Sequence, residues 1–315
     1  MQVTVIVPTY NASSKLSVLI RRLKEQTLEN LSILVVDSSS SDDTVEIAKA
    51  CHVGILIVDR DKFDHGGTRT IAGKTAKGDI HVYLTQDAFP SDVHALKALI
   101  TPFDNDHELA AVYGRQLPYP DATPFAAHSR LFNYPAQSFT RRLNDKERYG
   151  IKTAFLSNSF SAYRKSALEE IGWFKENLIS TEDTYAGAKL LLAGYSLAYA
   201  ADAMVYHSHN YTLLQEFKRY FDIGVFHEME SWIREAFGQA EGEGMRYLRS
   251  EIAYLKKMGK YLLFPELFIR NALKYFGYTL GRCYKCFPRV AIREMSMNRE
   301  WWHIIHSPQK ENHNE

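Results

Sequence analysis

The chain has 315 residues, of which 45% are hydrophobic and 24% are charged, so it can form one large domain with an appendage or two modest domains. Its net charge is +1, which argues against a nucleic-acid-binding protein. Three cysteines are too few for a secreted disulfide scaffold. No stretch of about 18 residues lacks charge, and the N-terminus shows no signal-peptide pattern, so we expect a cytoplasmic protein without a spanning helix.

The first 115 residues alternate between apolar runs that predict strands and stretches that predict helices. The strands are predicted at 3–10, 31–37, 54–59, 79–85 and 109–117. The first predicted helix carries apolar residues at helical spacing, namely Leu16, Leu19, Ile20 and Leu23. Further helices are predicted at 44–51, 68–77 and 91–103. Continuous apolar strands separated by helices are typical of a mostly parallel, Rossmann-like α/β sheet flanked by helices.

The second half of the chain is less regular. Residues 116–150 are rich in Pro, Tyr and Arg without a clear period, which predicts a long functional loop or lid. A strand-like stretch follows at 152–165, with helices after it and a short strand at 203–209. From about residue 213 the chain is basic, aromatic and mainly helical in pattern. We therefore divide it into an α/β domain, 1–212, and a helical C-terminal region, 213–315.

Ligands of parallel α/β sheets bind beyond the carboxyl ends of the strands. The polar residues at these positions are Thr9, Tyr10, Asn11, Asp37, Ser39, Asp59, Arg60 and Asp87. Three acids from separate parts of the chain are thus expected at one edge of the sheet. Asp37 and Asp59 can instead simply cap the turns that follow them.

Glu182 and Asp183 stand at the start of a predicted helix. Acids in the first turn interact favourably with the helix dipole, by about 0.3–1 kcal/mol each, and this alone accounts for either residue. Two adjacent acids point in different directions, however. One can therefore serve the scaffold while the other faces a cleft as a general base.

Asp87 closes an apolar run and is followed by the small residue Ala88. Mg²⁺ typically takes one or two carboxylates together with substrate phosphates and water, so this single acid is a candidate ligand. His207 and His209 face the same side of a predicted strand. They form either a pair of metal ligands or one ligand and a second group that orients it.

The segment from His65 to Arg69 reads HGGTR and precedes a predicted helix. It matches neither the phosphate-binding GxxxxGK[ST] pattern nor the dinucleotide-binding GxGxxG pattern. Its paired glycines still permit close approach of the backbone to a ligand, and Arg69 can contact a phosphate or a base.

Four motifs, VIVPTYN, VVDSSSSDDT, TQDA and TEDTYAGAKLLLAGY, follow one another in this order. Together they resemble the family-2 inverting glycosyltransferases of the GT-A fold, over about residues 3–210. A finer set is similar to the bacterial rhamnosyltransferase branch: HGGTR, LTQDA, YGRQLP, FNYP, LSNSFSAY and HSHNYT. Members of that branch transfer L-rhamnose from dTDP-L-rhamnose to cell-surface polysaccharides such as O-antigen.

The resemblance implies roles for individual residues. Asp183 would be the catalytic base beside Glu182, and Asp87 the retained acid of the family's DxD motif, which binds Mg²⁺ or Mn²⁺ with His207 or His209. The implied nucleotide-sugar-binding residues are Pro8, Thr9, Tyr10, Asn11, Asp37, Ser39, His65, Gly66, Arg69, Gln86 and Asp87. The chain departs from the family pattern at Thr85, which replaces the first DxD acid, and at Thr70, which replaces an Asn.

The implied acceptor is a glycan or a lipid-linked glycan. Residues 260–287 alternate aromatic and aliphatic residues with Lys and Arg. As a helix this segment has an apolar face rimmed by basic residues, which fits peripheral contact with the inner face of the cell membrane. Packing of that face on the catalytic domain, or on a second subunit in a homodimer, fits equally well.

Three alternatives remain open at the level of sequence. One is a transferase that uses a UDP-sugar donor. Another is a sugar nucleotidyltransferase, which should have a glycine-rich, basic loop where this chain has VPTYNASS. A third is a non-catalytic subunit that binds a nucleotide sugar or a glycan, against which the presence of both Asp87 and the Glu182–Asp183 pair argues.

Overall fold

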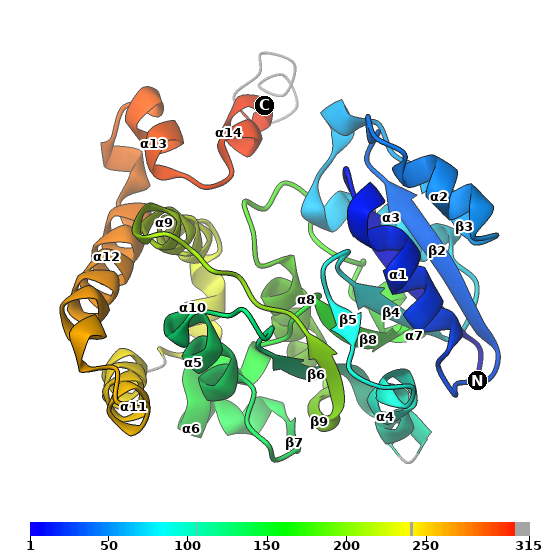
Figure 1. Cartoon of the computed structure of the whole chain (residues 1–315), viewed down its shortest axis with the longest axis horizontal. Coiled ribbons are helices and arrows are strands. Elements are labelled where there is room, and N and C mark those ends of the chain that lie inside the picture. Colours follow the sequence, from blue (N-terminus) through cyan, green and yellow to red (C-terminus); the bar gives the residue numbers. More distant parts are fainter. Residues whose placement is uncertain (105, 240–241, 306–315) are drawn as a thin grey trace.

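The computed structural model describes residues 1–104, 106–239 and 242–305. Within them, nine strands form one sheet with helices on both faces (Figure 1). The strands are β1 (Val3–Thr9), β2 (Leu31–Asp37), β3 (Gly54–Ile57), β4 (Ile80–Leu84), β5 (Phe89–Pro90), β6 (Leu109–Leu117), β7 (Phe139–Arg141), β8 (Phe160–Arg164) and β9 (Ser196–Tyr206). Their order across the sheet is β3-β2-β1-β4-β8-β6-β9-β5, and β7 also pairs with β9.

Most of these strands point the same way. β1 pairs in parallel with β2 and β4, β2 with β3, and β6 with β9. β8 runs antiparallel between β4 and β6, which gives those two strands a common direction. β5 and β7 run antiparallel to β9. The predicted mostly parallel α/β sheet is therefore confirmed, and the carboxyl ends of β1, β2, β4, β6 and β9 lie along one edge.

Alternate residues of each strand face opposite sides of the sheet, so each face needs a covering layer. One face packs against α1 (Ser13–Lys24) and α4 (Ala95–Ile100). The other packs against α3 (His65–Thr75), α7 (Lys165–Glu170) and α8 (Glu182–Leu192). The apolar stripe predicted for the first helix is confirmed, because its four residues are all buried in α1.

Residues 116–150 differ from the predicted long loop. They contain α5 (Pro124–Asn133), β7 and α6 (Lys146–Tyr149). Thr123 caps α5 by accepting a hydrogen bond from the backbone N–H of Ala126, and Pro124 occupies the first helical position, where its missing N–H costs nothing. The prediction of a loop or lid without regular structure is therefore wrong for this segment.

Other boundaries also differ from the prediction. α3 begins at His65 rather than at residue 68, since Asp64 caps it by accepting a hydrogen bond from the backbone N–H of Gly67 (2.6 Å). Only Phe160–Arg164 of the stretch 152–165 is a strand. β9 starts at Ser196, seven residues before the predicted strand, because its pairing with β6 continues past an irregularity between Ala200 and Met204.

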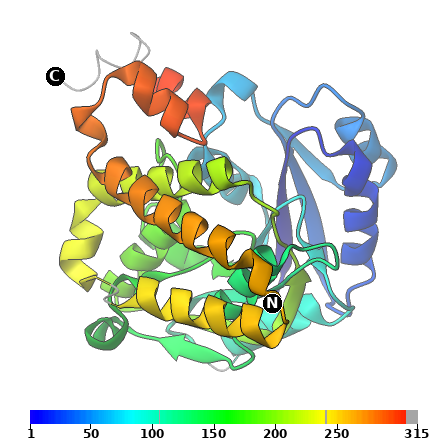
Figure 2. The same cartoon turned by 60° about the vertical axis from the view of Figure 1, so that its left-hand side comes forward.

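Beyond residue 212 the described chain is helical, as predicted. The helices are α9 (Leu213–Met229), α10 (Ser231–Phe237), α11 (Glu243–Lys257), α12 (Phe264–Arg282), α13 (Arg289–Met295) and α14 (Arg299–Ile305); α2 (Thr44–Ala50) completes the set. Figure 2 shows α9, α12 and α11 stacked side by side. Residue 213 is the first residue of α9, and one hydrophobic cluster contains Tyr83 and Leu190 together with Phe221 and Trp301.

Two glycines of α12 let this helix approach α9 closely. A Cβ atom on Gly277 would lie 2.5 Å from the carbonyl oxygen of Phe217, and one on Gly281 would lie 2.1 Å from that of Phe221. Both distances are far inside van der Waals contact, so these positions require glycine. None of the described helices is at once long enough and apolar enough to cross a lipid bilayer.

Candidate active site

The loops after β1 and β2 hold each other in place. Asn11, at φ +48°, accepts a hydrogen bond at Oδ1 from the Ser41 N–H and donates its own N–H to Ser40 Oγ, each at 2.9 Å. Asp37 is fully buried and accepts hydrogen bonds from the Ser40 N–H (2.8 Å) and Oγ (2.5 Å) and from Thr9 Oγ1 (3.2 Å). The predicted donor-binding residues Thr9, Asn11 and Asp37 are therefore brought together, and Asp37 also organises the turn that follows it.

Gln86 and Tyr10 join the end of β4 to the end of β1. The backbone N–H of Tyr10 donates to Gln86 Oε1 (2.8 Å), and Gln86 Nε2 donates to the Tyr10 carbonyl (3.2 Å). The guanidinium of Arg60 lies 3.9 Å from the centre of the Tyr10 ring. Ser39, at φ +56°, donates its hydroxyl to the carbonyl of Val58. Pro8 lies in β1 opposite Val36. The polar residues that follow three different strands thus form one continuous edge.

Asp87, His207 and His209 converge at the ends of β4 and β9. Each offers one ligand atom, and these atoms all lie within 4.8 Å of one another. Nε2 of His207 is 3.4 Å from Oδ1 of Asp87, and Nε2 of His209 is 3.6 Å from Oδ2. β5 pairs with the last residues of β9, which places the segment after β4 beside the segment after β9. The sequence left open which histidine faces Asp87, and the geometry shows that both do.

Gln116, at the end of β6, orients the His207 ring. Arg130 donates to Oε1 of Gln116 (2.6 Å), and because Arg can only donate, this contact identifies the amide oxygen. Nδ1 of His207 lies 2.9 Å from the same oxygen and must therefore carry its proton. The lone pair of neutral His207 is then on Nε2 and faces the carboxylate of Asp87. Two acceptors that face each other in this way need a shared proton or a cation between them, so the group fits a divalent ion.

The protonation states of Asp87 and His209 also favour the binding of a divalent cation. Burial favours the neutral form of Asp87, but a proton shared with Nε2 of His207, together with the positive charge that each histidine carries when protonated, holds the pKa of Asp87 well below its usual range. Burial, with a contribution from His207, lowers the pKa of His209 to about 4. A neutral imidazole and an ionised carboxylate are the forms that bind metals.

Glu182 and Asp183 begin α8, and Asn158 contacts both. The backbone N–H of Asn158 donates to Oδ2 of Asp183 (3.1 Å), while its side-chain amide donates to Oε1 of Glu182 (3.0 Å). The Asn158 side-chain oxygen accepts from Ser161 Oγ and Tyr163 Oη at 2.9 and 2.7 Å. Glu182 is 6% exposed, whereas Asp183 is only partly buried. The two acids therefore differ in burial, since Glu182 is enclosed by its neighbours and Asp183 lies nearer the surface.

Arg69 and His65 lie beside Glu182. Nη1 of Arg69 is 3.2 Å from Oε1 of Glu182 and also donates to the carbonyl of His65. A Cβ atom on Gly66 would lie 1.9 Å from the carbonyl oxygen of Lys175. The close approach predicted for the paired glycines is thus made by Gly66 to the protein's own backbone. The HGGTR segment forms the first turn and a half of α3, and it places the guanidinium of Arg69 beside Glu182.

The pKa values of the two acids move in opposite directions. Burial disfavours the ionised form of Glu182, but Arg69, His65 and the Asn158 amide together hold the pKa of Glu182 below its usual value. Burial and the neighbouring charge of Glu182 raise the pKa of Asp183 to about 7. Burial also lowers the pKa of His65. A carboxyl group with a pKa near 7 is well matched to general base catalysis at neutral pH.

A hydrogen-bonded path connects the Asp–His–His group with the acid pair. Nε2 of Gln116 donates to Oγ of Ser157 (2.8 Å), and the next residue, Asn158, donates to Asp183. The path therefore runs from His207 through Gln116 and the 157–158 peptide to Asp183. Gln116 and Asn158 are not identified as site residues by the sequence pattern. YGRQLP and LSNSFSAY contain them, but polar residues in apolar strand patterns carry no signal of their partners.

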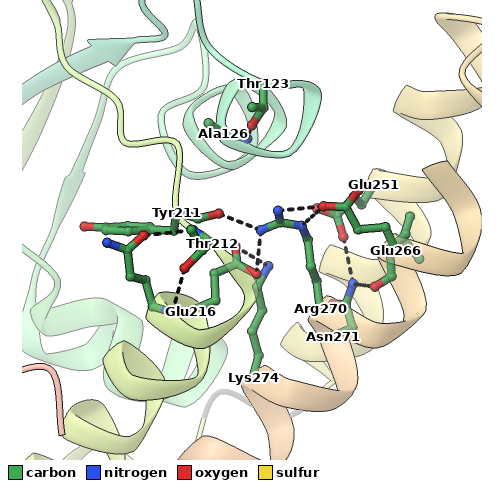
Figure 3. Close-up of polar contacts among 12 residues, drawn as sticks. Thr123, Ala126, Tyr211, Thr212, Glu216, Glu251, Glu266, Arg270, Asn271 and Lys274 are labelled. Atoms are coloured by element: carbon green, nitrogen blue, oxygen red, sulfur yellow. Dashed lines mark hydrogen bonds and ion pairs between the residues drawn. The ribbon is translucent and has the colours of Figure 1, made fainter.

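A buried charge network fixes the segment just after His209 (Figure 3). Arg270 of α12 donates to the carbonyl of Tyr211 (3.0 Å) and forms ion pairs with Glu216 (3.2 Å) and Glu266 (2.6 Å). Lys274 lies 3.7 Å from Glu216. Arg270 thus bridges α12, α9 and the loop that leads out of β9. The helical region thereby supports the position of His209.

Comparison with known proteins identifies the family. The family model described as glycosyl transferase family 2 matches residues 4–172. The chain is 44% identical to the O-antigen chain rhamnosyltransferase RfbN of Salmonella typhimurium, over 97% of each chain. It is 43% identical to the O-antigen chain rhamnosyltransferase WbaN of Salmonella anatum, over 96% of each.

A solved structure supports the fold. The mannosyltransferase PcManGT from Pyrobaculum calidifontis, in complex with GDP-Man and Mn²⁺, superposes with a TM-score of 0.59 at 18% identity, covering 96% of this chain and 85% of that one. The GT-A fold predicted from the motifs is thus confirmed. The chain belongs to glycosyl transferase family 2.

Proposed function

We propose that this protein is a metal-dependent, inverting rhamnosyltransferase that moves L-rhamnose from dTDP-L-rhamnose to a glycan or lipid-linked glycan of a cell-surface polysaccharide. The observation that carries the proposal is the hydrogen-bonded path from His207 through Gln116 to Asp183, because it holds a cation-binding group and a base together at one edge of the sheet. The choice of rhamnose is supported by 44% identity to an O-antigen chain rhamnosyltransferase over nearly the whole chain.

Asp87, His207 and His209 are the proposed ligands of a divalent cation. Bound there, a cation would supply positive charge to the leaving diphosphate. Mg²⁺ binds almost entirely through oxygen, whereas two imidazole donors suit a transition metal, so Mn²⁺ fits this set better. The residues at the ends of β1 and β2, with Gln86, His65, Gly66 and Arg69, form the proposed remainder of the donor site.

Asp183 is the proposed base. Its carboxylate takes the proton of the acceptor hydroxyl while that oxygen forms a bond to the anomeric carbon of the donor sugar. The bond from that carbon to the diphosphate breaks on the opposite side, which inverts the anomeric centre. Glu182 tunes this base, because its negative charge helps to keep the pKa of Asp183 near neutrality.

The test is a binding and transfer assay with the purified protein. We expect dTDP-L-rhamnose with Mn²⁺ to raise the melting temperature and UDP-glucose, UDP-N-acetylglucosamine and GDP-mannose to have little effect, since a ligand stabilises the native state by mass action. Asp87→Asn should abolish the Mn²⁺-dependent part of the shift. Asp202→Asn, a change of an exposed Asp in β9, is the matched control. A shift with a UDP-sugar alone would overturn the donor, and binding without sugar transfer would favour a non-catalytic subunit.

We further propose that α12, together with the short turn of residues 261–263 that precedes it, contacts the inner face of the cell membrane. Exposed large apolar side chains line the segment 261–276, led by Leu262 at 95% exposure; the others are Tyr261, Phe268, Ile269, Tyr275 and Phe276. Exposed basic residues flank them, namely Lys256, Lys257, Lys260, Lys285 and Arg289. An apolar stripe with cationic flanks fits an anionic lipid surface better than a second copy of the same cationic face.

Co-sedimentation with phosphatidylglycerol vesicles at low salt tests this surface. The double change Leu262→Ser and Phe268→Ser should reduce the bound fraction severalfold, whereas Val18→Ser, a change of an exposed apolar residue on α1, should leave it unchanged. Equal vesicle binding by both variants would contradict the proposal. A wild-type dimer in solution that the double change converts to a monomer would assign the stripe to a subunit contact instead.

A further inference from the structure

A cavity of about 250 Å³ lies beside the ends of β1 and β2, next to the proposed donor site. One wall comes from the sheet edge and α3, through Tyr10, Ser38, Arg60, Phe63, Asp64 and His65. The facing wall comes from the far end of the chain, through Asn298, Glu300, Trp301 and Ile304. Its volume is somewhat below the roughly 300–1,000 Å³ of pockets for drug-sized ligands, and it therefore suits a nucleoside.

Two buried polar atoms on opposite walls lack a partner. Among the described residues, neither Oγ of Ser38 nor Nε1 of Trp301 makes a hydrogen bond. Both side chains are deeply buried, at 3% and 6% exposure. Buried polar atoms are nearly always hydrogen-bonded, and both residues line the cavity, so these two atoms can pair with polar groups of a ligand bound there. The indole N–H can only donate, which requires an acceptor such as a ring carbonyl.

The wall formed by α14 is held in a fixed position. Asp222 of α9 accepts hydrogen bonds from Ser296 Oγ (2.7 Å) and from the backbone N–H groups of Met297 (3.0 Å) and Asn298 (3.1 Å). The Asn298 amide donates to the carbonyl of Ile179 (3.0 Å). These contacts anchor the segment that leads into α14. This wall of the cavity is therefore held in position by the protein itself, as a preorganised binding site requires.

A second contact ties α14 directly to the sheet edge. Glu300 lies 3.2 Å from Arg60, whose guanidinium lies over the ring of Tyr10. This pair is partly exposed, so its contribution to stability is small. The pair joins the two walls of the cavity, because Arg60 and Glu300 both line it.

We propose that α14 forms the outer wall of the pocket for the donor's pyrimidine nucleoside, and that Trp301 donates its indole N–H to a carbonyl of the base. This inference rests on the proposed function, since it takes the donor to be a nucleoside diphosphate sugar. It makes Trp301 a specificity-determining residue that lies well beyond residue 172, where the family match ends. The pocket then has one wall from the shared family fold and one from the helical region of this chain.

Calorimetric titration of the full-length protein tests the assignment without any sugar or acceptor. The protein is titrated with dTDP, UDP and GDP in the presence of Mn²⁺, and the nucleotide that binds most tightly is used for the variants. Trp301→Phe should weaken its binding about 3- to 10-fold, which corresponds to the loss of one hydrogen bond. Binding of inorganic pyrophosphate with Mn²⁺ should not change, because pyrophosphate has no base.

Trp232→Phe is the matched control, because the Trp232 indole already donates to Glu230 and does not line the cavity. Nucleotide should quench tryptophan fluorescence in the wild type and in this control, but much less in Trp301→Phe. Equal nucleotide affinity of Trp301→Phe and the wild type would overturn the proposal.

Hydrogen exchange on the wild-type protein guards against a folding defect in the variant. The amides of residues 298–304 should exchange more slowly when the nucleotide is bound, and unchanged exchange there would also overturn the proposal. Failure of the rhamnose assignment is distinguishable, since it would appear as preference for another nucleotide or as binding without rhamnose transfer, while the effect of Trp301 persisted.

Discussion

Arg69 and Glu182 form a buried ion pair directly beside Asp183, with Nη1 of Arg69 3.2 Å from Oε1 of Glu182. The positive charge of Arg69 favours the ionised form of Glu182 and lowers its pKa. The charge on Glu182 then opposes ionisation of Asp183, which is its neighbour in the chain. Two adjacent carboxyl groups thus acquire different protonation behaviour from their surroundings, which is how acid and base roles are commonly separated in enzymes.

The first prediction concerns the base. Asp183→Asn should lower turnover by about 10²- to 10⁴-fold, because an amide cannot accept the acceptor's proton. Nucleotide affinity should stay within about twofold, since Asp183 is not among the residues lining the nucleoside cavity. Transfer of labelled rhamnose to a membrane-derived acceptor measures the first quantity, and calorimetry measures the second. Asp202→Asn should behave as wild type in both assays, and normal turnover in Asp183→Asn would disprove the role.

The second prediction concerns pH. The raised pKa of Asp183 means that kcat/KM should rise with pH and level off above about pH 7, where the base is deprotonated. Glu182→Gln removes the negative charge that helps to raise this pKa, while the positive charge of Arg69 remains. The acid limb of the profile should therefore move to lower pH in this variant. A limb that stays in place, or moves to higher pH, would show that Glu182 does not tune the base.

The third prediction concerns Gln116. Gln116→Leu removes the oxygen that accepts the Nδ1 proton of His207, so Mn²⁺ affinity should fall about 10- to 100-fold. Gln116→Glu keeps an acceptor at this position and should retain most of the affinity. Titration of the free Mn²⁺ signal by electron paramagnetic resonance measures both. Gln137→Leu changes an exposed glutamine as a control, and equal affinities in all four proteins would remove Gln116 from the metal site.

The fourth prediction concerns stability. Gly277→Ala places a methyl group 2.5 Å from the carbonyl oxygen of Phe217 and forces α9 and α12 apart. We expect a loss of about 1–3 kcal/mol in the free energy of unfolding. Gly244→Ala, in α11, meets nothing within 4 Å and should be neutral or slightly stabilising. Urea titration compares the two, and similar midpoints would mean that the helices can separate at little cost.

Much of the fold follows from local sequence pattern. The apolar runs 31–37 and 109–117 match β2 and β6 residue for residue, because buried parallel strands need uninterrupted apolar sequence. The position of Asp37, Asp87 and the residues after β1 at one edge follows from the parallel direction of those strands. Strand positions that depend on a local apolar pattern can therefore be predicted from the sequence.

The rest depends on contacts between distant residues. β9 was predicted too short, because its first half reads as a continuation of the segment after α8 until its partner β6 is known. The helix α5 had a local signal in Thr123 and Pro124, which was hidden by the aromatic and basic composition around it. Gln116 and Asn158 gain their roles only from partners brought close by the fold. Trp301 lines the same cavity as Tyr10 and Ser38, and no rule of sequence spacing relates residues so far apart in the chain.

The pairing of Phe89 with Tyr206 in β5 and β9 has a consequence for biosynthesis. β1 to β4 can pair with one another as they emerge, and only the second edge of β4 has to wait for β8. The Asp–His–His group, however, cannot form until the two histidines that follow β9 have been synthesised. A nascent chain that ends before residue 207 can hold much of the sheet, yet it lacks the complete Asp–His–His group. Metal affinity therefore reports on a late stage of folding, and a protein truncated within β9 should keep secondary structure while losing this site.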